Sequence, residues 1–207
     1  MPDIPDSPRT FILVGNLPCL DLVNTRPLRH GQPEELLRTF SDLVAWLEAA
    51  GILTATQGRA ALKRWDGTSE GGRTLRRALA LREELRSLAE RTAAGGAIGA
   101  GAVRAVNRIL ASRPAFQQLV SEGKRWKSEQ RTVSEDAIHL LVPVAESAAW
   151  LIEHGDPALL RKCEDPACVL YFYDTTKNKR RRWCSMDGCG SRAKAAAYYR
   201  RERKKVR

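Results

Sequence analysis

The sequence predicts an α+β protein, with a mainly helical N-terminal domain that includes a few short strands and a small C-terminal module made of a β-hairpin and a helix. Apolar residues recur at helical spacing through most of the first three quarters of the chain. Four of the five cysteines and most of the excess positive charge lie in the last quarter. A chain of 207 residues is long enough for one medium-sized domain and one small module. We therefore expect two domains, over residues 1–157 and 158–207.

Two short apolar runs, residues 11–14 and 17–23, begin the N-terminal domain and are separated by Gly15 and Asn16. This pattern predicts a β-hairpin or two short strands. Cys19 lies in the second run, far in sequence from the other cysteines. We expect it to be a buried core residue, because a free cysteine packs as a small hydrophobic side chain.

The helices of the N-terminal domain are predicted from apolar residues that recur every three or four positions. The predicted ranges are residues 33–50, 54–65, 73–94, 103–110 and 134–153. A capping box formed by Thr54 and Gln57 marks the start of the second of these helices. Pro143 is expected to kink or shorten the last one, because proline removes a backbone hydrogen bond inside a helix.

The segments between these helices are predicted from turn residues and strand-prone runs. Residues 66–72 are expected to form a loop, and residues 115–133 two strands around a turn at Gly123. Asp156 and Pro157 are typical of a helix N-cap and of the first helical residue that follows it.

The four clustered cysteines follow the pattern C-x4-C, fifteen residues, C-x4-C, and are Cys163, Cys168, Cys184 and Cys189. Two cysteine pairs separated by a hairpin-sized segment are typical of a structural zinc site, in which four thiolates hold one Zn²⁺ tetrahedrally. We expect residues 169–173 and 180–184 to pair around a polar turn, and a helix to follow the last cysteine, in a treble-clef-like zinc finger. Such a module has little apolar content, so the metal would supply much of its folding energy.

Other uses of the four cysteines stay open from the residues alone. An iron–sulfur cluster is also held by four thiolates. Disulfides are a further alternative, although a cytosolic chain keeps its thiols reduced. A catalytic zinc site is disfavoured, because such a site keeps one coordination position open for water.

Positive charge is concentrated beside the cysteines. Residues 1–160 contain 20 Lys and Arg against 19 Asp and Glu, whereas residues 161–207 contain 15 against 5. Basic residues on a metal-stabilised platform are typical of nucleic-acid binding, because they neutralise phosphates. Trp183 is expected to pack in the core of the module, with a nucleic-acid contact as the alternative. The candidate DNA contacts are the basic residues around the second cysteine pair: Lys177, Lys179, Arg180, Arg181, Arg182, Arg192 and Lys194.

The segment "DTTKNKRRRWCSMDGCGSRAKAAAYYRR", residues 174–201, resembles the CGNR zinc finger, which is named for a Cys-Gly-Asn-Arg motif at its last ligand. The similarity rests on the turn before the arginines, on the Trp-Cys-Ser-Met run and on the Arg-Ala-Lys run after the last cysteine. The resemblance implies one structural Zn²⁺ and adds Asn178 and Ser191 to the candidate DNA contacts. Ser191 replaces the asparagine of the motif, so a DNA contact made by that asparagine would be altered here.

The N-terminal part resembles the ABATE domain, which precedes this finger in stress-induced transcription regulators. "LPCLDLVNT", residues 17–25, is similar to the opening motif of that domain, and "LVPVAESAAWLI", residues 141–152, to its closing helix. The two resemblances together cover nearly the whole chain and imply a bacterial DNA-binding transcription regulator.

The leading hypothesis is a regulator whose finger binds DNA and whose N-terminal domain senses a small-molecule effector or mediates assembly, for example as a homodimer. Asp21, Asn24 and Thr25 are the candidate effector contacts, because they follow the end of a predicted strand, where polar groups can converge. The alternative for these residues is that they satisfy backbone groups of a turn.

The same residues are compatible with one other class of function. An RNA- or ribosome-associated protein is the alternative, since basic zinc modules also bind RNA. An enzyme is not expected, because no catalytic motif surrounds the three histidines or any pair of carboxylates. No apolar run is long enough to span a membrane and the N-terminal residues lack the features of a signal peptide, so the expected location is the cytoplasm.

Overall fold

The computed structural model describes residues 10–112, 115–123, 125–132 and 136–205. Helices dominate, and the strands of the described residues form three antiparallel two-stranded ribbons, which confirms the α+β class. Two of the short helices are 3₁₀ turns (η1, η2) and one is a π-helical turn (η3). In chain order the elements are α1 (Pro18–Val23), β1 (Leu28–Arg29), β2 (Gln32–Pro33), α2 (Phe40–Ala49), α3 (Ala55–Trp65), α4 (Ser69–Ala93), α5 (Ala100–Leu110), β3 (Ala115–Glu122), β4 (Arg125–Thr132), η1 (Ala137–Leu141), α6 (Val142–His154), η2 (Pro157–Leu159), β5 (Leu160–Lys162), β6 (Tyr171–Tyr173), η3 (Met186–Gly190) and α7 (Ser191–Lys205).

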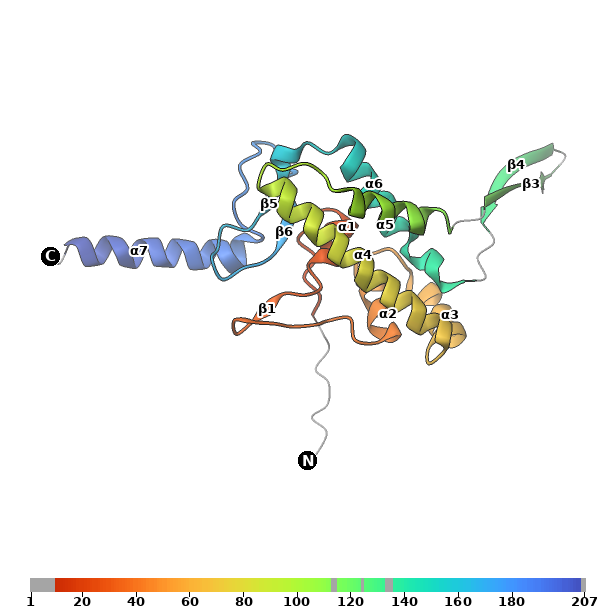
Figure 1. Cartoon of the computed structure of the whole chain (residues 1–207), viewed down its shortest axis with the longest axis horizontal. Coiled ribbons are helices and arrows are strands. Elements are labelled where there is room, and N and C mark those ends of the chain that lie inside the picture. The colour runs from red at the N-terminus through yellow and green to blue at the C-terminus, as the bar shows by residue number, and fades with distance from the viewer. Residues whose placement is uncertain (1–9, 113–114, 124, 133–135, 206–207) are drawn as a thin grey trace, which may run out of the picture.

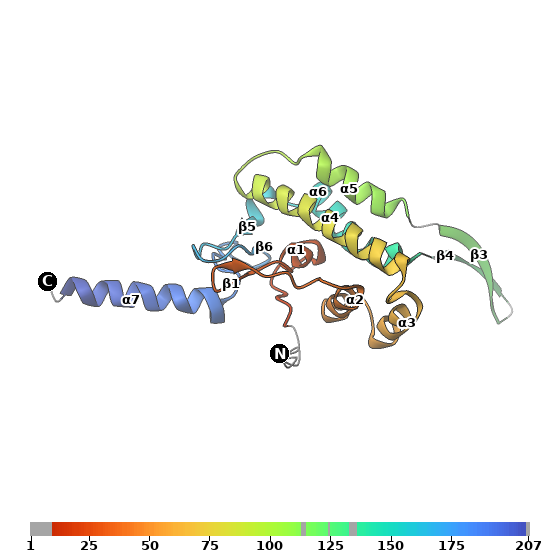
Figure 2. The same ribbon diagram turned by 60° about the horizontal axis from the view of Figure 1, so that its bottom comes forward.

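Helix α4 forms the centre of the helical part and contacts α1, α2, α3 and α5. Figure 1 shows it crossing the body of the molecule, with the β3–β4 ribbon and α7 projecting at opposite ends. In the view of Figure 2, α5 lies on one side of α4, and α2 and α3 lie on the other. Leu81, Leu85 and Leu88 share one face of α4 at helical spacing and are buried, so this face holds the surrounding helices together.

The first apolar region contains a helix rather than strands, so the predicted N-terminal hairpin is wrong. Residues 17–23 form α1, with Pro18 at its start, and residues 11–14 have no strand partner among the described residues. Proline suits the first turn of a helix, where its missing N–H has no intrahelical acceptor. The buried residues Cys19, Leu20, Leu22 and Val23 occur in adjacent pairs, which is helical spacing, and Cys19 is a core residue as expected.

The observed helix starts follow capping residues. The capping box at Thr54 is confirmed at the start of α3. Helix α2 begins at Phe40 rather than at residue 33, because Thr39 and Asp42 form a second capping box. Helix α4 begins at Ser69, inside the predicted loop, because the Thr68 side chain accepts a hydrogen bond from the N–H of Gly71.

The later segments agree with the prediction more closely. Helix α5 covers its predicted range and begins three residues earlier, and β3 and β4 pair around Gly123, whose φ is +66°. Pro143 lies in the first turn of α6, so the predicted helix is divided into η1 and α6; its residues 134 and 135 lie outside the described part. Asp156 caps a turn as predicted, but this turn is the short η2.

The C-terminal hairpin forms between strands other than the predicted pair. Strand β6 pairs with β5, which precedes it, whereas residues 180–184 form no strand. The reason is the buried carboxylate of Asp174, which accepts hydrogen bonds from the N–H groups of Thr176 and Arg181 and so closes a wide loop directly after β6. The predicted helix after the last cysteine is confirmed as α7.

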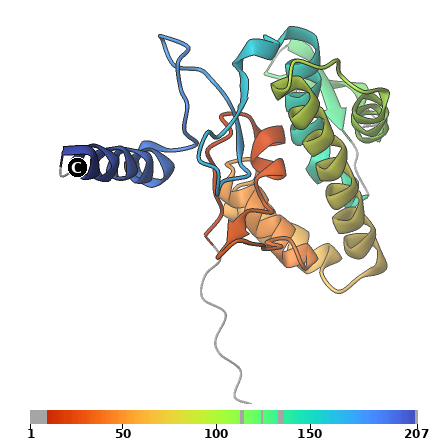
Figure 3. The same ribbon diagram turned by 60° about the vertical axis from the view of Figure 1, so that its left-hand side comes forward.

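The C-terminal module is joined to the helical part by a shared core. Leu160, Tyr171 and Tyr173 belong to the same buried cluster as the helices, and the N–H of Tyr173 donates to the carbonyl of Gly15 at 2.9 Å. Figure 3 shows α7 standing apart from the helices, connected through this region. None of the described helices is long and apolar enough to cross a membrane.

Candidate metal centre and nucleic-acid interface

The four cysteines of the C-terminal module converge on one point. Cys163 and Cys168 lie in the turn between β5 and β6, whereas Cys184 and Cys189 lie just before and within η3, which leads into α7. Their sulfur atoms all lie within 4.8 Å of one another, with 3.8 Å between Cys168 and Cys184 and 3.4 Å between Cys184 and Cys189. Zinc–sulfur bonds of about 2.3 Å place tetrahedral thiolates roughly 3.8 Å apart, whereas a disulfide requires about 2.05 Å. The arrangement fits a four-thiolate metal site.

Hydrogen-bond donors surround the sulfur atoms. The N–H of Cys184 lies 3.3 Å from the sulfur of Cys163, and the Arg192 guanidinium lies 2.9 Å from the sulfur of Cys189. Arg192 also donates to the carboxylate of Asp165 at 2.8 and 3.0 Å. Four thiolates around one Zn²⁺ carry a net negative charge, so these donors would stabilise the metal-bound state and orient its ligands.

A small apolar cluster packs around the cysteines. Leu170 and Phe172 are buried against them, with Trp183 half-buried at the edge, as predicted for its packing. Ile12 and Val14 join this cluster from the N-terminal segment, which the sequence did not indicate. The metal centre is therefore covered by residues from both ends of the chain.

The predicted DNA contacts divide into two groups in the structure. Arg181, Arg182 and Arg192 are held by other groups of the protein; Arg182 donates to Glu164 at 2.7 Å and lies over the Trp183 ring at 4.9 Å. The Arg182 hydrogen bond lowers the pKa of Glu164, which keeps this ion pair charged. Of these three arginines, Arg182 and Arg192 are nevertheless exposed. The remaining predicted contacts are exposed too: Lys177, Asn178, Lys179, Arg180, Ser191 and Lys194.

A groove of about 590 Å³ lies beside the exposed group. It contains Arg180 and Arg182, the ring of Trp183 and several hydroxyl and amide side chains. Its members missing from the sequence prediction are Asn16, Thr175, Thr176, Ser185 and Met186. Asn16 comes from the N-terminal segment and donates to the carbonyl of Tyr173 at 2.9 Å and to the hydroxyl of Thr175 at 3.1 Å. No pattern in the sequence marks Asn16, although its φ of 62° in the fold is a conformation that asparagine tolerates.

Comparison with protein families follows the same division of the chain. Residues 16–155 match the model of the ABATE family, described as "Putative stress-induced transcription regulator". The chain belongs to the ABATE family. Residues 160–202 match the CGNR zinc finger, so the four cysteines hold one structural zinc rather than an iron–sulfur cluster. No curated protein matches this ABATE chain.

The candidate effector residues of the ABATE domain make hydrogen bonds within the chain. The Asn24 amide bonds both the carbonyl of Tyr171, at 2.9 Å, and its N–H, at 3.0 Å. The Thr25 hydroxyl donates to the carbonyl of Leu22 and accepts from Arg82. The Asp21 carboxylate accepts from the N–H of Gly15 at 2.8 Å, and burial raises its pKa to about 6. These contacts agree with the alternative that the three residues satisfy groups of the chain itself, and those of Asn24 join the ABATE domain to the finger.

Arg181 was predicted to contact DNA, but in the CGNR finger its side chain supports the fold. Its guanidinium donates to the carbonyls of Val14 and Trp183, each at 3.0 Å, and to that of Cys184, and it stacks on the Phe172 ring at 4.1 Å. One planar side chain thus ties the N-terminal segment to the metal centre. Arg180 next to it is exposed.

This difference between adjacent arginines leads to a prediction. Arg181→Lys is expected to lower the free energy of unfolding of the zinc-loaded protein by about 2–4 kcal/mol, because lysine cannot replace the forked contacts of a guanidinium. Arg180→Lys, with the same change of side chain at an exposed position, should leave stability unchanged. Urea unfolding followed by circular dichroism compares the two. Equal stability of both variants would show that the Arg181 contacts contribute nothing.

Proposed function

We propose that this ABATE protein is a DNA-binding transcription regulator in which the zinc finger binds the DNA backbone. The observation that carries the proposal is the row of exposed cations Lys177, Lys179 and Arg180 on a loop that is fixed at both ends. The Asp174 carboxylate accepts from the N–H of Thr176 at the start of this loop and from that of Arg181 at its end. Arg161 donates to the carbonyls of Lys179 and Arg181 at 2.9 and 3.2 Å. Cations on a rigid loop bind phosphates without first losing the freedom of the loop.

The groove beside this loop supports a role in positioning the nucleic acid. Hydroxyl groups of Thr175 and Ser185 and the amide of Asn178 provide neutral hydrogen-bond partners among the cations. Such groups contact phosphate and sugar atoms in protein–DNA complexes and set the register of the protein on the duplex. Trp183 and Met186 add apolar surface, which suits contact with sugars or base edges.

The remaining parts of the proposal concern the ABATE domain and the cell. We propose that this domain senses a small-molecule effector or mediates assembly as a homodimer, that the chain has no enzymatic activity and that it acts in the cytoplasm. An RNA- or ribosome-associated role is the second candidate, because the exposed cations would neutralise RNA phosphates equally well.

The experiment that tests the proposal separates the two nucleic acids. The full chain, tagged in its host, is cross-linked, purified and sequenced for bound DNA and bound RNA in parallel. Enrichment of discrete genomic duplex sites supports the regulator. Enrichment of ribosomal or other RNA without discrete DNA sites would replace the proposal by the second candidate.

Replacing Asn16 with glycine tests whether its side chain contributes to DNA binding at the groove. Asn16→Gly removes the amide while keeping the left-handed backbone, which glycine adopts freely. We expect roughly five-fold weaker binding to duplex DNA, because the Thr175 end of the loop loses one hydrogen bond that fixes it. Fluorescence anisotropy with a labelled duplex provides the measurement.

The matched control for this variant is His30→Gly. His30 has a similar positive φ of 51° but is not part of the groove. The control should bind DNA with the affinity of the unmodified protein. If both glycine variants weaken binding equally, Asn16 has no specific part in the groove.

A further inference from the structure

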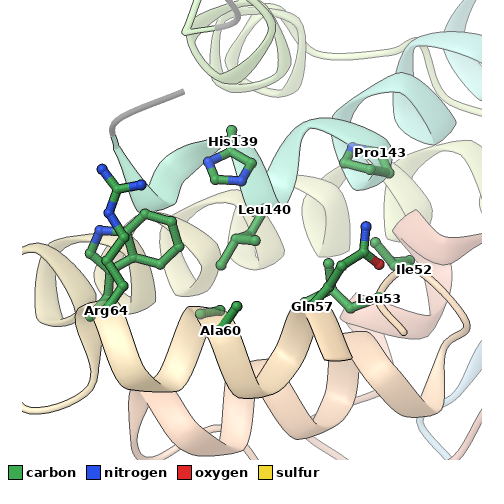
Figure 4. Close-up of a pocket in the computed structure, with 10 residues that line it drawn as sticks. Ile52, Leu53, Gln57, Ala60, Arg64, His139, Leu140 and Pro143 are labelled. Atoms are coloured by element: carbon green, nitrogen blue, oxygen red, sulfur yellow. The ribbon is translucent and has the colours of Figure 1, made fainter. Parts of the chain in front are cut away.

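A second cavity, of about 420 Å³, lies in the ABATE domain between α3 and the η1–α6 segment. In Figure 4, Ala60 of α3 faces Leu140 across this cavity, with Arg64 at one end and Gln57 at the other. The space opens at the surface, where Ala60, Arg64 and Pro143 are exposed, and the small side chain of Ala60 leaves it unfilled. Its volume lies within the range of small-molecule sites.

The walls of the cavity are apolar in the middle. Ile52, Leu53, Ala61, Leu140 and Pro143 provide aliphatic surface. The ring of Trp65 closes the end near Arg64 and meets the His139 ring edge-on, with 5.5 Å between the ring centroids. Two aromatic rings and an aliphatic floor favour a flat apolar ligand, since such a ligand buries its faces against them.

The polar groups at the ends of the cavity are mainly donors. The Gln57 carbonyl accepts from the N–H and hydroxyl of Thr54, so the capping box fixes the amide and leaves its NH₂ group for another partner. The Arg64 guanidinium lies over the Trp65 ring at 4.9 Å. Nδ1 of His139 lies 2.6 Å from the carbonyl of Asp136, so it donates there and its proton is fixed on that side.

These features define the ligand. Gln57 and Arg64 are seven residues apart on one helix, which separates them by about 10 Å along its axis. We infer that this cavity is the effector site of the protein and binds a small aromatic carboxylate, with the carboxylate toward Arg64 and the ring between α3 and Leu140. This inference rests on the proposed sensing role of the ABATE domain.

The position of α6 links the cavity to the finger. Pro143 in the cavity wall lies in the first turn of α6, and Trp150 further along α6 packs edge-on against Tyr173 of β6 at 5.9 Å. Tyr173 in turn bonds Asn16 and Gly15 beside the groove. A ligand that shifts α6 therefore acts on residues that hold the DNA-binding loop.

The test uses two probes of the same shape and opposite charge on the zinc-loaded full chain. Isothermal titration should show that 2-naphthoate binds with at least about ten-fold higher affinity than 2-naphthylmethylammonium, because the guanidinium of Arg64 favours the anion. Ala60→Leu fills the cavity and should weaken naphthoate binding at least ten-fold, whereas Ala55→Leu, at an exposed alanine of the same helix outside the cavity, should not. Arg64→Gln should remove the preference for the anion while leaving the fold intact.

Three results would overturn the inference: no binding of naphthoate, equal binding of both probes, or equal affinities for Ala60→Leu and Ala55→Leu. Duplex DNA binding of the same samples is measured in parallel. A protein that binds naphthoate but no DNA contradicts the proposed regulator and not the cavity. A protein that binds DNA but no naphthoate contradicts the cavity alone.

Discussion

Replacing Cys184 with serine is expected to abolish zinc binding and to unfold the C-terminal module. The sulfur of Cys184 lies 3.8 Å from the sulfur of Cys168 and 3.4 Å from that of Cys189. Its loss therefore removes one of the four thiolates that surround the metal. Structural zinc contributes about 10–16 kcal/mol in small fingers, and the apolar cluster around these cysteines is too small to replace it. Zinc content per chain and far-ultraviolet circular dichroism measure the two effects.

The matched control for this variant is Cys19→Ser. Cys19 is fully buried in α1 and lies outside the cysteine cluster, and burial raises the pKa of its thiol to about 12, so it is a neutral core residue. The control should keep one zinc per chain and lose only packing stability. Full zinc content in Cys184→Ser, or equal loss of zinc in both variants, would contradict the assignment of the metal centre.

The second large effect concerns the exposed cations of the loop. The triple variant Lys177→Ala, Lys179→Ala, Arg180→Ala is expected to weaken duplex DNA binding roughly a hundred-fold at about 0.15 M salt, because three phosphate contacts are lost. The slope of log Kd against log salt concentration should fall by about 2.7. Anisotropy titrations over a range of salt concentrations measure both quantities.

A control of equal charge separates local contacts from net charge. Arg59 and Lys63 of α3 and Arg76 of α4 are exposed. Figure 1 shows α3 and the adjoining end of α4 toward the end of the molecule that is far from α7. Their replacement by alanine removes the same charge and should leave the affinity and the salt slope nearly unchanged. Similar losses in both triple variants would mean that DNA responds to net charge and that the loop is no binding site.

The metal centre could be predicted from the sequence because its chemistry is local. Cysteine spacing determines which thiolates can converge, and all four predicted ligands are brought together. The hairpin that carries them was predicted wrongly, because strand β6 can pair with a segment on either side. The choice depends on Asp174, whose buried carboxylate bonds the N–H of Arg181 across the loop, and this contact is formed only in the folded chain.

The surface of the finger was harder to predict, since an arginine can bind phosphate or support the fold. Arg181 and Arg192 are of the residue type expected for DNA contacts, but both support the fold. Arg181 donates to backbone carbonyls, and Arg192 donates to Asp165 and to the sulfur of Cys189. Asn16 shows the opposite case, because it lies more than 150 residues from the loop in sequence and reaches the groove only through the fold. Ser191 donates to the carbonyl of Met186 at 2.9 Å at the start of α7, so a serine at this position is engaged with the turn that carries Cys189.

The hairpin predicted at the N-terminus was wrong because the segment is short. Residues 17–23 are too few for periodicity to separate a helix from a strand, and Pro18 at the first helical position was the available signal. The start of α2 was also encoded locally, because Thr39 and Asp42 form a capping box of the same kind as the one that identified the start of α3 at Thr54. Capping residues therefore predict helix starts in this chain better than apolar periodicity does.

The affinity of the full chain for duplex DNA, measured before and after zinc is removed, shows whether the metal builds the DNA-binding surface. Zinc-loaded protein should bind a labelled duplex with an affinity that falls steeply with salt, should lose this binding when a chelator removes the metal, and should recover it when zinc is restored. Equal affinity with and without zinc, or no binding of duplex DNA by the zinc-loaded chain at moderate salt, would contradict the claim that the metal builds the DNA-binding surface.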